Sequence, residues 1–166
     1  IIAELCRSES ESRIQRTEFA QAANFLLQVS LVAELAAVGI EPAAIVGHSV
    51  GEVSAAYVSG ALGLADAVTV SHHRGRLQAT TDGTGGLLAV GLPAAAAQRW
   101  LTEAGAADIV IAAVNGPDSV TLAGPLGAID EIHESWQDSD VFVRRLQVAV
   151  PYHSPMMDPI LDELCT

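Results

Sequence analysis

The chain contains no lysine, because all eight of its basic residues are arginines. It therefore lacks the residue that contacts phosphate in a P-loop, forms a pyridoxal Schiff base or completes a Ser-Lys catalytic pair. Acidic residues outnumber basic ones by 20 to 8, and the formal net charge is −12. No basic stripe is available to neutralise a phosphate backbone, so nucleic acid is not expected as a partner.

Cysteines and long apolar runs are also scarce. Cys6 and Cys165 are the two cysteines, and neither has metal-ligand spacing around it, so we expect reduced thiols and no metal. No uninterrupted apolar stretch reaches the roughly 18 residues of a membrane span, and the first residues turn polar too soon for a signal peptide. The composition predicts a soluble, cytoplasmic protein without a membrane partner. Half of the residues are hydrophobic, enough for one substantial core or two small ones.

Apolar periodicity predicts a mostly helical first part. We expect a long, mostly buried helix over 17–38, a short buried strand over 42–47, and helices over 49–61 and 64–79. Turn residues gather at 80–86, in "TTDGTGG", and mark a subdomain boundary.

The second part has a different rhythm, strand-helix-strand-strand-helix-strand. This order is the split βαβ, ferredoxin-like pattern, and "NGPD" at 115–118 supplies the turn between the two middle strands. The predicted elements are strands over 86–92, 108–115, 119–124 and 141–148 and helices over 94–104 and 125–136. We therefore divide the chain into 1–83, an inserted subdomain 84–149, and a returning segment 150–166 in which Ser154 caps a final helix.

The pentapeptide Gly47-His48-Ser49-Val50-Gly51 fits the nucleophile-elbow pattern, in which small flanking residues let the backbone bend sharply and expose the serine. An ordinary strand-to-helix turn with Ser49 as N-cap is the alternative. A serine hydroxyl needs a base, and histidine is the usual one at neutral pH. Because His153 lies where the chain returns from the insert, we favour it among five histidines, the others being His48, His72, His73 and His133.

Arg74 is the other unusual residue, on a predicted helix that is otherwise apolar on one face. A snorkelling side chain or a cation near a helix C-terminus explains it simply. The functional interpretation is a clamp, because a guanidinium matches a carboxylate with two parallel hydrogen bonds.

Four motifs in order, "GHSVGE", "RGRLQ", "VNGPDSVTLAG" and "YHSPMM", resemble the acyltransferase domains of polyketide synthases and the malonyl-CoA:acyl carrier protein transacylases of fatty acid synthesis. The resemblance runs from about residue 14 to 160. It implies an α/β fold, with an α/β-hydrolase-like core and a ferredoxin-like small subdomain. Because the family's opening "GQGSQ" segment and its closing stretch are not present, the chain is expected to be the middle part of a longer domain.

The resemblance also implies residue roles. Ser49 is the acylated nucleophile, His153 the base, Arg74 the clamp for a carboxylate, the backbone N–H of Val50 an oxyanion donor, and His48 the motif histidine beside the substrate. The expected reaction moves a malonyl-type unit from coenzyme A to an acyl carrier protein within a synthase of several domains, with no metal or redox cofactor.

Substrate choice is predicted from the residues before the histidine. The family often shows "HAFH" there for malonyl and "YASH" for methylmalonyl, whereas this chain has "VPYH". Because Tyr152 is bulky, and Val50 replaces a frequent glutamine, we expect malonyl-CoA to be preferred. Two other readings stay open. One is a serine esterase or thioesterase, for which Asp108 and Asp118 are the available acids, and the other is a non-catalytic docking fragment.

Overall fold

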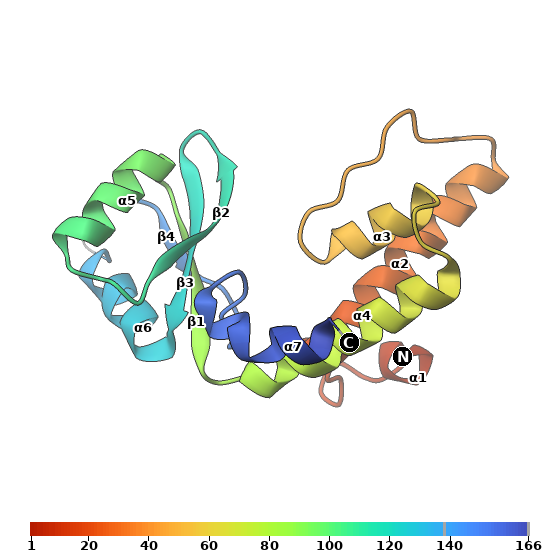
Figure 1. Cartoon of the computed structure of the whole chain (residues 1–166), viewed down its shortest axis with the longest axis horizontal. Helices are drawn as coiled ribbons and strands as arrows, with labels where there is room; N and C mark the ends of the chain where they lie inside the picture. Colours follow the sequence, from red (N-terminus) through yellow and green to blue (C-terminus); the bar gives the residue numbers. More distant parts are fainter. Residues whose placement is uncertain (138, 166) are drawn as a thin grey trace. The chain divides into compact units, whose positions relative to one another are not determined.

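The chain divides into two compact units, residues 1–79 and 80–166. A computed structural model describes residues 1–137 and 139–165 (Figure 1). The first unit is helical and the second contains the sheet. Residues 150–166 are grouped with the second unit, and the division into 1–83, 84–149 and 150–166 stays a prediction.

Three helices form the first unit, together with a single short turn of helix at its start. The predicted long helices are confirmed. Phe25, Val53 and Ala67, one from each long helix, form the small core, and Tyr57 packs edge-on against Phe25 with 6.2 Å between ring centroids. The helices are α1 (Ile2–Leu5), α2 (Thr17–Ala37), α3 (Gly51–Val58) and α4 (Leu64–Gln78).

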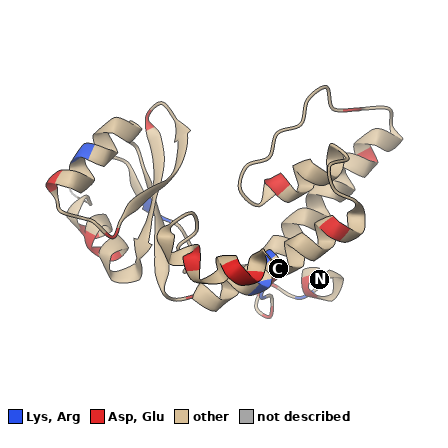
Figure 2. Cartoon of the chain, viewed as in Figure 1, with Lys and Arg blue, Asp and Glu red and all other residues tan. Residues whose placement is uncertain are grey.

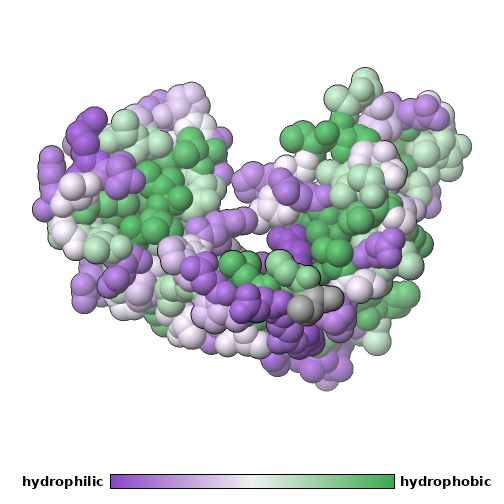
Figure 3. Space-filling model, viewed as in Figure 1, coloured by the Kyte–Doolittle hydropathy of each residue, from purple (hydrophilic) through white to green (hydrophobic). Residues whose placement is uncertain are grey.

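Helix α2 is much less buried than its composition suggests. The prediction of a mostly buried helix is wrong, since Leu27 is 68% exposed, Leu31 58% and Val38 73%. Helices α3 and α4 pack against α2, and the apolar residues that they leave uncovered add to the apolar surface of this unit (Figure 3). By length and composition alone α2 would span a membrane, a property that core helices of soluble proteins share.

The segment before the elbow is not a strand. Residues 40–48 are irregular, with Ile45 39% and Val46 95% exposed, so the strand predicted over 42–47 is wrong. A strand needs a neighbour for its ladder of hydrogen bonds, and every strand among the described residues lies in the second unit. The apolar run therefore has no partner strand.

The second unit is a four-stranded antiparallel sheet in the order β2-β3-β1-β4. The ferredoxin-like order predicted for the insert is confirmed, and the two-residue turn 117–118 joins the middle strands. Strand β4 is three residues long instead of spanning 141–148. The elements are β1 (Gly85–Val90), α5 (Ala94–Glu103), β2 (Val110–Gly116), β3 (Ser119–Pro125), α6 (Leu126–Ser135) and β4 (Val143–Arg145), preceded by a 3₁₀ turn, η1 (Ala79–Thr81).

Helices α5 and α6 cover one face of this sheet (Figure 1). Leu88, Leu122 and Ile129 are fully buried between helix and sheet, and the rings of Trp100 and Trp136 meet with their centroids 4.3 Å apart. Burial of side chains of this size is worth about 1.5 to 3 kcal/mol each, so this core stabilises the sheet unit.

The end of the chain begins as a 3₁₀ helix, η2 (Pro155–Ile160), and continues as α7 (Leu161–Leu164). The predicted cap is confirmed, because the Ser154 side chain accepts a hydrogen bond from the N–H of Met156. The helix type differs from the single helix expected. Pro159 lies inside it and has no N–H to donate to an α-helical bond.

A buried carboxylate anchors the start of the helical unit. Glu4, 4% exposed, accepts hydrogen bonds from the backbone N–H and the guanidinium of Arg13 and forms an ion pair with Arg7 at 3.0 Å. These bonds to Arg13 hold the pKa of Glu4 below its ordinary value. Arg13 in turn lies over the ring of Phe19 in α2, 4.5 Å from the centroid. Acidic residues far outnumber basic ones in this chain (Figure 2). Two of its eight arginines, Arg7 and Arg13, are used in this cluster around Glu4.

Candidate active site

Ser49 occupies a sharp turn at the start of α3. Its φ is +51°, a left-handed conformation that is uncommon for residues other than glycine. The N–H of Gly51 donates to the carbonyl of His48 at 2.9 Å, and the N–H of Glu52 donates to the carbonyl of Ser49 at 3.0 Å. The chain thus passes from an irregular segment into a helix within three residues. A nucleophile elbow has a sharp turn into a helix of this kind, but there a strand precedes the turn.

The two glycines of the motif have different roles. A Cβ at Gly47 would lie 2.5 Å from the Cα and 2.8 Å from the N of Glu52, inside any allowed contact. A Cβ at Gly51 would meet nothing nearer than the Gln28 amide at 3.8 Å, an ordinary contact. The close approach at Gly47 is therefore what lets the chain fold back against α3.

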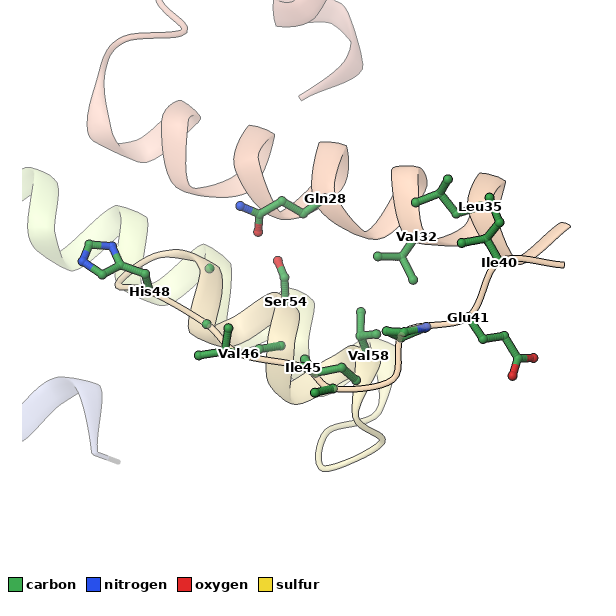
Figure 4. Close-up of a pocket in the computed structure, with 15 residues that line it drawn as sticks. Gln28, Val32, Leu35, Ile40, Glu41, Ile45, Val46, His48, Ser54 and Val58 are labelled. Carbon is green, nitrogen blue, oxygen red and sulfur yellow. The ribbon is translucent and has the colours of Figure 1, made fainter. Parts of the chain in front are cut away.

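A cavity of about 520 Å³ opens beside the elbow, lined by α2, α3 and residues 40–48 (Figure 4). Its walls are mainly apolar side chains such as Val32 and Ile45. Gln28 and Ser54 point toward one another across it (Figure 4), and Gln28 Oε1 and Ser54 Oγ are buried without a hydrogen-bond partner. His48 lies at one end of the cavity and is exposed.

Arg74 lies on α4, in the same unit as the elbow, and is half-buried. The next residue, Gly75, sets how closely α4 packs on α2, because a Cβ there would lie 3.2 Å from Gln21 Cβ. Gln21 Nε2 also donates to Gln78 Oε1 at 2.9 Å. This close packing determines where α4 carries Arg74.

His153 lies in a tight turn of the second unit, with a φ of +58°. The turn is anchored to the start of β1, since Gly83 N–H donates to Ala149 O at 2.8 Å and Pro151 is fully buried. A Cβ at Gly85 would lie 2.5 Å from Pro151 Cβ, so only glycine admits the proline there. Tyr152 is half-buried and His153 is exposed.

The predicted site residues are therefore divided between the units. The elbow brings His48, Ser49 and Val50 together, and Arg74 belongs to the same helical unit, whereas Tyr152 and His153 share one turn of the sheet unit.

Other residues named from the sequence, or missed by it, can now be placed. The acids considered for an esterase triad, Asp108 and Asp118, are exposed on loops flanking β2. Ser154 was predicted only as a helix cap, but its hydroxyl also donates a hydrogen bond to the carbonyl of Pro151 within the turn that contains His153. In the sequence, the serine directly after His153 and before a proline was the signal for this second bond. Among the described residues no group of three or more His, Cys, Asp or Glu is placed to hold a metal.

Ser49 and His153 share a backbone property. Among the described residues, they are the two other than glycine with positive φ. Such a conformation costs about 1 to 3 kcal/mol, persists only where the surroundings impose it, and clusters at active sites. Both outliers fall on residues that the sequence predicts as nucleophile and base.

All 166 residues, 1–166, match the family model described as "Acyl transferase domain". The chain belongs to this family. It is 40% identical over 156 residues to reducing polyketide synthase rdc5 of Metacordyceps chlamydosporia, covering 94% of this chain and 6% of that protein. It is 43% identical over 152 residues to phthioceranic/hydroxyphthioceranic acid synthase of Mycobacterium bovis, covering 92% and 7%. The chain thus spans a small fraction of the length of these relatives.

Solved structures of acyltransferases share the fold. The acyltransferase domain from module 8 of the salinomycin polyketide synthase is 35% identical with a TM-score of 0.86, and the match covers 94% of this chain and 37% of that one. The malonyl CoA-acyl carrier protein transacylase of Burkholderia pseudomallei is 25% identical with a TM-score of 0.88, covering 98% and 57%. The fold class and the family predicted from the sequence are confirmed.

Proposed function

We propose that this acyltransferase moves a malonyl unit from coenzyme A to the phosphopantetheine thiol of an acyl carrier protein, through an ester on Ser49. The carrier and the other domains of a synthase are its expected partners, in the cytoplasm. No metal or redox cofactor is needed, because thioester exchange requires only a nucleophile, a base and an oxyanion site.

In the first half-reaction His153 accepts the proton of the Ser49 hydroxyl while Oγ attacks the thioester carbonyl carbon. The backbone N–H of Val50 donates a hydrogen bond to the oxyanion of the tetrahedral intermediate, and one such donor is worth about 3 kcal/mol. The C–S bond then breaks, and the proton on His153 passes to the sulfur of coenzyme A. The second half-reaction reverses these steps with the carrier thiol, and Ser49 recovers its proton.

We assign substrate recognition to Arg74, His48 and Tyr152. The Arg74 guanidinium pairs with the free carboxylate of the malonyl unit, His48 lies beside the bound substrate, and Tyr152 restricts the space for a branching methyl. The carboxylate contact selects malonyl over acetyl units, and the tyrosine selects malonyl over methylmalonyl units.

The observation that carries the proposal is the strained backbone at Ser49 and His153. In an ordinary strand-to-helix turn with a serine N-cap, the serine has an extended backbone. The left-handed Ser49 and the contact distances at Gly47 favour the elbow over that alternative.

Intact-protein mass spectrometry after mixing with malonyl-CoA tests the proposal. We expect a stable malonyl adduct that is lost with Ser49→Ala and transferred to a carrier protein when one is added. His153→Ala should form the adduct about 10²- to 10⁴-fold more slowly, the usual contribution of a general base. An adduct that persists in Ser49→Ala would overturn the assignment of the nucleophile.

The same experiment separates the two alternatives. A serine esterase or thioesterase would release free malonate, with an adduct that is transient or absent. A docking fragment would form no adduct and consume no thioester.

A further inference from the structure

Ser154 makes two hydrogen bonds that close the backbone around His153. Its hydroxyl donates to the carbonyl of Pro151 at 2.7 Å and accepts from the N–H of Met156 at 3.3 Å. The carbonyl of Ser154 also accepts from the N–H of Met157 at 3.0 Å. The residue is 8% exposed, so water does not compete strongly for these bonds.

These two hydrogen bonds of the Ser154 hydroxyl, here called the Ser154 clasp, span His153, the residue of the turn that has an unfavourable backbone. One bond reaches back across His153 to Pro151, and the other reaches forward to the first turn of η2. Pro151 is itself fully buried and lies close against Gly85. The bonds of Ser154 therefore tie together the backbone on the two sides of the left-handed His153.

We infer that Ser154 is a positioning residue for His153, which holds the backbone at φ +58° and thereby directs the imidazole. The inference rests on the proposed role of His153 as the base. The hydroxyl of Ser154 does not need to touch substrate for this role. Its loss would let the turn relax toward a right-handed or extended backbone, which is favourable for histidine, and the imidazole would move with it.

A second serine in the same unit provides a matched control. Ser139 donates from its hydroxyl to Trp136 O at 2.8 Å and accepts from Val141 N–H at 3.2 Å, the same spacing along the chain as in the Ser154 clasp. It lies between α6 and β4, away in sequence from any candidate site residue. Removing its hydroxyl deletes the same pair of bonds without reaching the His153 turn.

The test is the single-turnover rate of Ser49 acylation by malonyl-CoA in the whole protein, measured as a function of pH. A misplacement of about 1 Å costs roughly 100-fold in rate, so we expect Ser154→Ala to fall about 10- to 100-fold with the KM for malonyl-CoA unchanged. The apparent pKa of the rate profile should shift as the imidazole changes its surroundings. Ser154→Thr, which keeps the hydroxyl, should restore most of the rate, and Ser139→Ala should stay within about twofold of the parent.

The controls separate this inference from the proposed function. If His153→Ala acylates as fast as the parent, the proposed base is wrong. If His153→Ala is slow but Ser154→Ala has the parent's rate and pH profile, the positioning role is wrong. The role is also wrong if Ser139→Ala loses as much rate as Ser154→Ala. Should Ser154→Ala not fold, Ser154→Cys keeps the shape of the side chain with weaker bonds and should show the same loss to a smaller degree.

Discussion

Replacing Gly47 by alanine is expected to disrupt the elbow, whereas the same change at Gly51 is expected to be tolerated. The methyl group at residue 47 would lie 2.5 Å from Glu52 Cα and 2.9 Å from Gly51 O. Carbon atoms pack at about 3.5 to 4.0 Å, so the backbone before the elbow and the first turn of α3 must separate by about 1 Å. No rotamer change relieves this contact, because Glu52 Cα and Gly51 O are backbone atoms.

The magnitude follows from that separation. Overpacking costs about 1 to 3 kcal/mol of stability, and a displacement of about 1 Å at the nucleophile costs roughly 100-fold in rate. At Gly51 the new methyl would make an ordinary contact with the Gln28 amide at 3.8 Å. Alanine is favoured over glycine within a helix by up to about 1 kcal/mol, so Gly51→Ala should leave stability equal or slightly raised.

The assay is thermal unfolding of each variant together with its single-turnover acylation by malonyl-CoA. Gly47→Ala should unfold at a lower temperature and acylate about 100-fold more slowly, with Gly51→Ala close to the parent in both. Equal losses for the two variants would refute the reasoning, because they would show that the motif needs both glycines for space. A fully active Gly47→Ala would show that the elbow is not as close to α3 as described.

Three further predictions concern substrate choice and stability. Arg74→Ala should acylate about 10- to 150-fold more slowly with malonyl-CoA, which corresponds to the loss of hydrogen bonds to a charged group. Its acylation rate with acetyl-CoA should be unchanged. Equal losses with both thioesters would show that Arg74 has a structural role. With both thioesters competing for one carrier protein, malonyl should exceed methylmalonyl transfer by about 10- to 200-fold, and equal transfer would place the Tyr152 ring outside the pocket. Because the pKa of Glu4 is lowered on folding, its contribution to stability is present at neutral pH and fades as the pH falls below the ordinary glutamate pKa of about 4.3. Urea unfolding measured from pH 7 to pH 3 should therefore show that Glu4→Gln loses less stability on acidification than the parent. If the unfolding free energies of the two proteins fall in parallel with pH, Glu4 does not make this contribution.

The sequence predicts well those elements whose stabilising contacts are local or lie within one unit. The ferredoxin-like order was readable because its apolar faces are covered by helices from the same stretch of chain. The helix starting at Gly51 was readable because glycine and serine interrupt the apolar run just before it. The cap at Ser154 needed only the serine before a proline and an apolar series.

The sequence predicts poorly where the structure depends on neighbours. The residues Ile45 and Val46 have the composition of a buried strand, yet a strand is stable only beside another. The apolar face of α2 similarly suggested burial, but Leu27 is 68% exposed and Leu31 58%. In both cases an apolar pattern states what a segment can bury, and the tertiary contacts decide whether it does so.

The candidate site shows how a short motif can be tested against backbone geometry. "GHSVG" states that small residues flank a serine, but it does not distinguish an N-cap from an elbow, and it presents its two glycines as equivalent. The left-handed φ of Ser49 and the contact at Gly47 separate these alternatives. Among the five histidines, His153 is the one with a positive φ, and apart from the glycines it shares this property only with Ser49 among the described residues. Strain of this kind has to be maintained against about 1 to 3 kcal/mol, and the bonds of Ser154 and the burial of Pro151 are the contacts that maintain it at the proposed base.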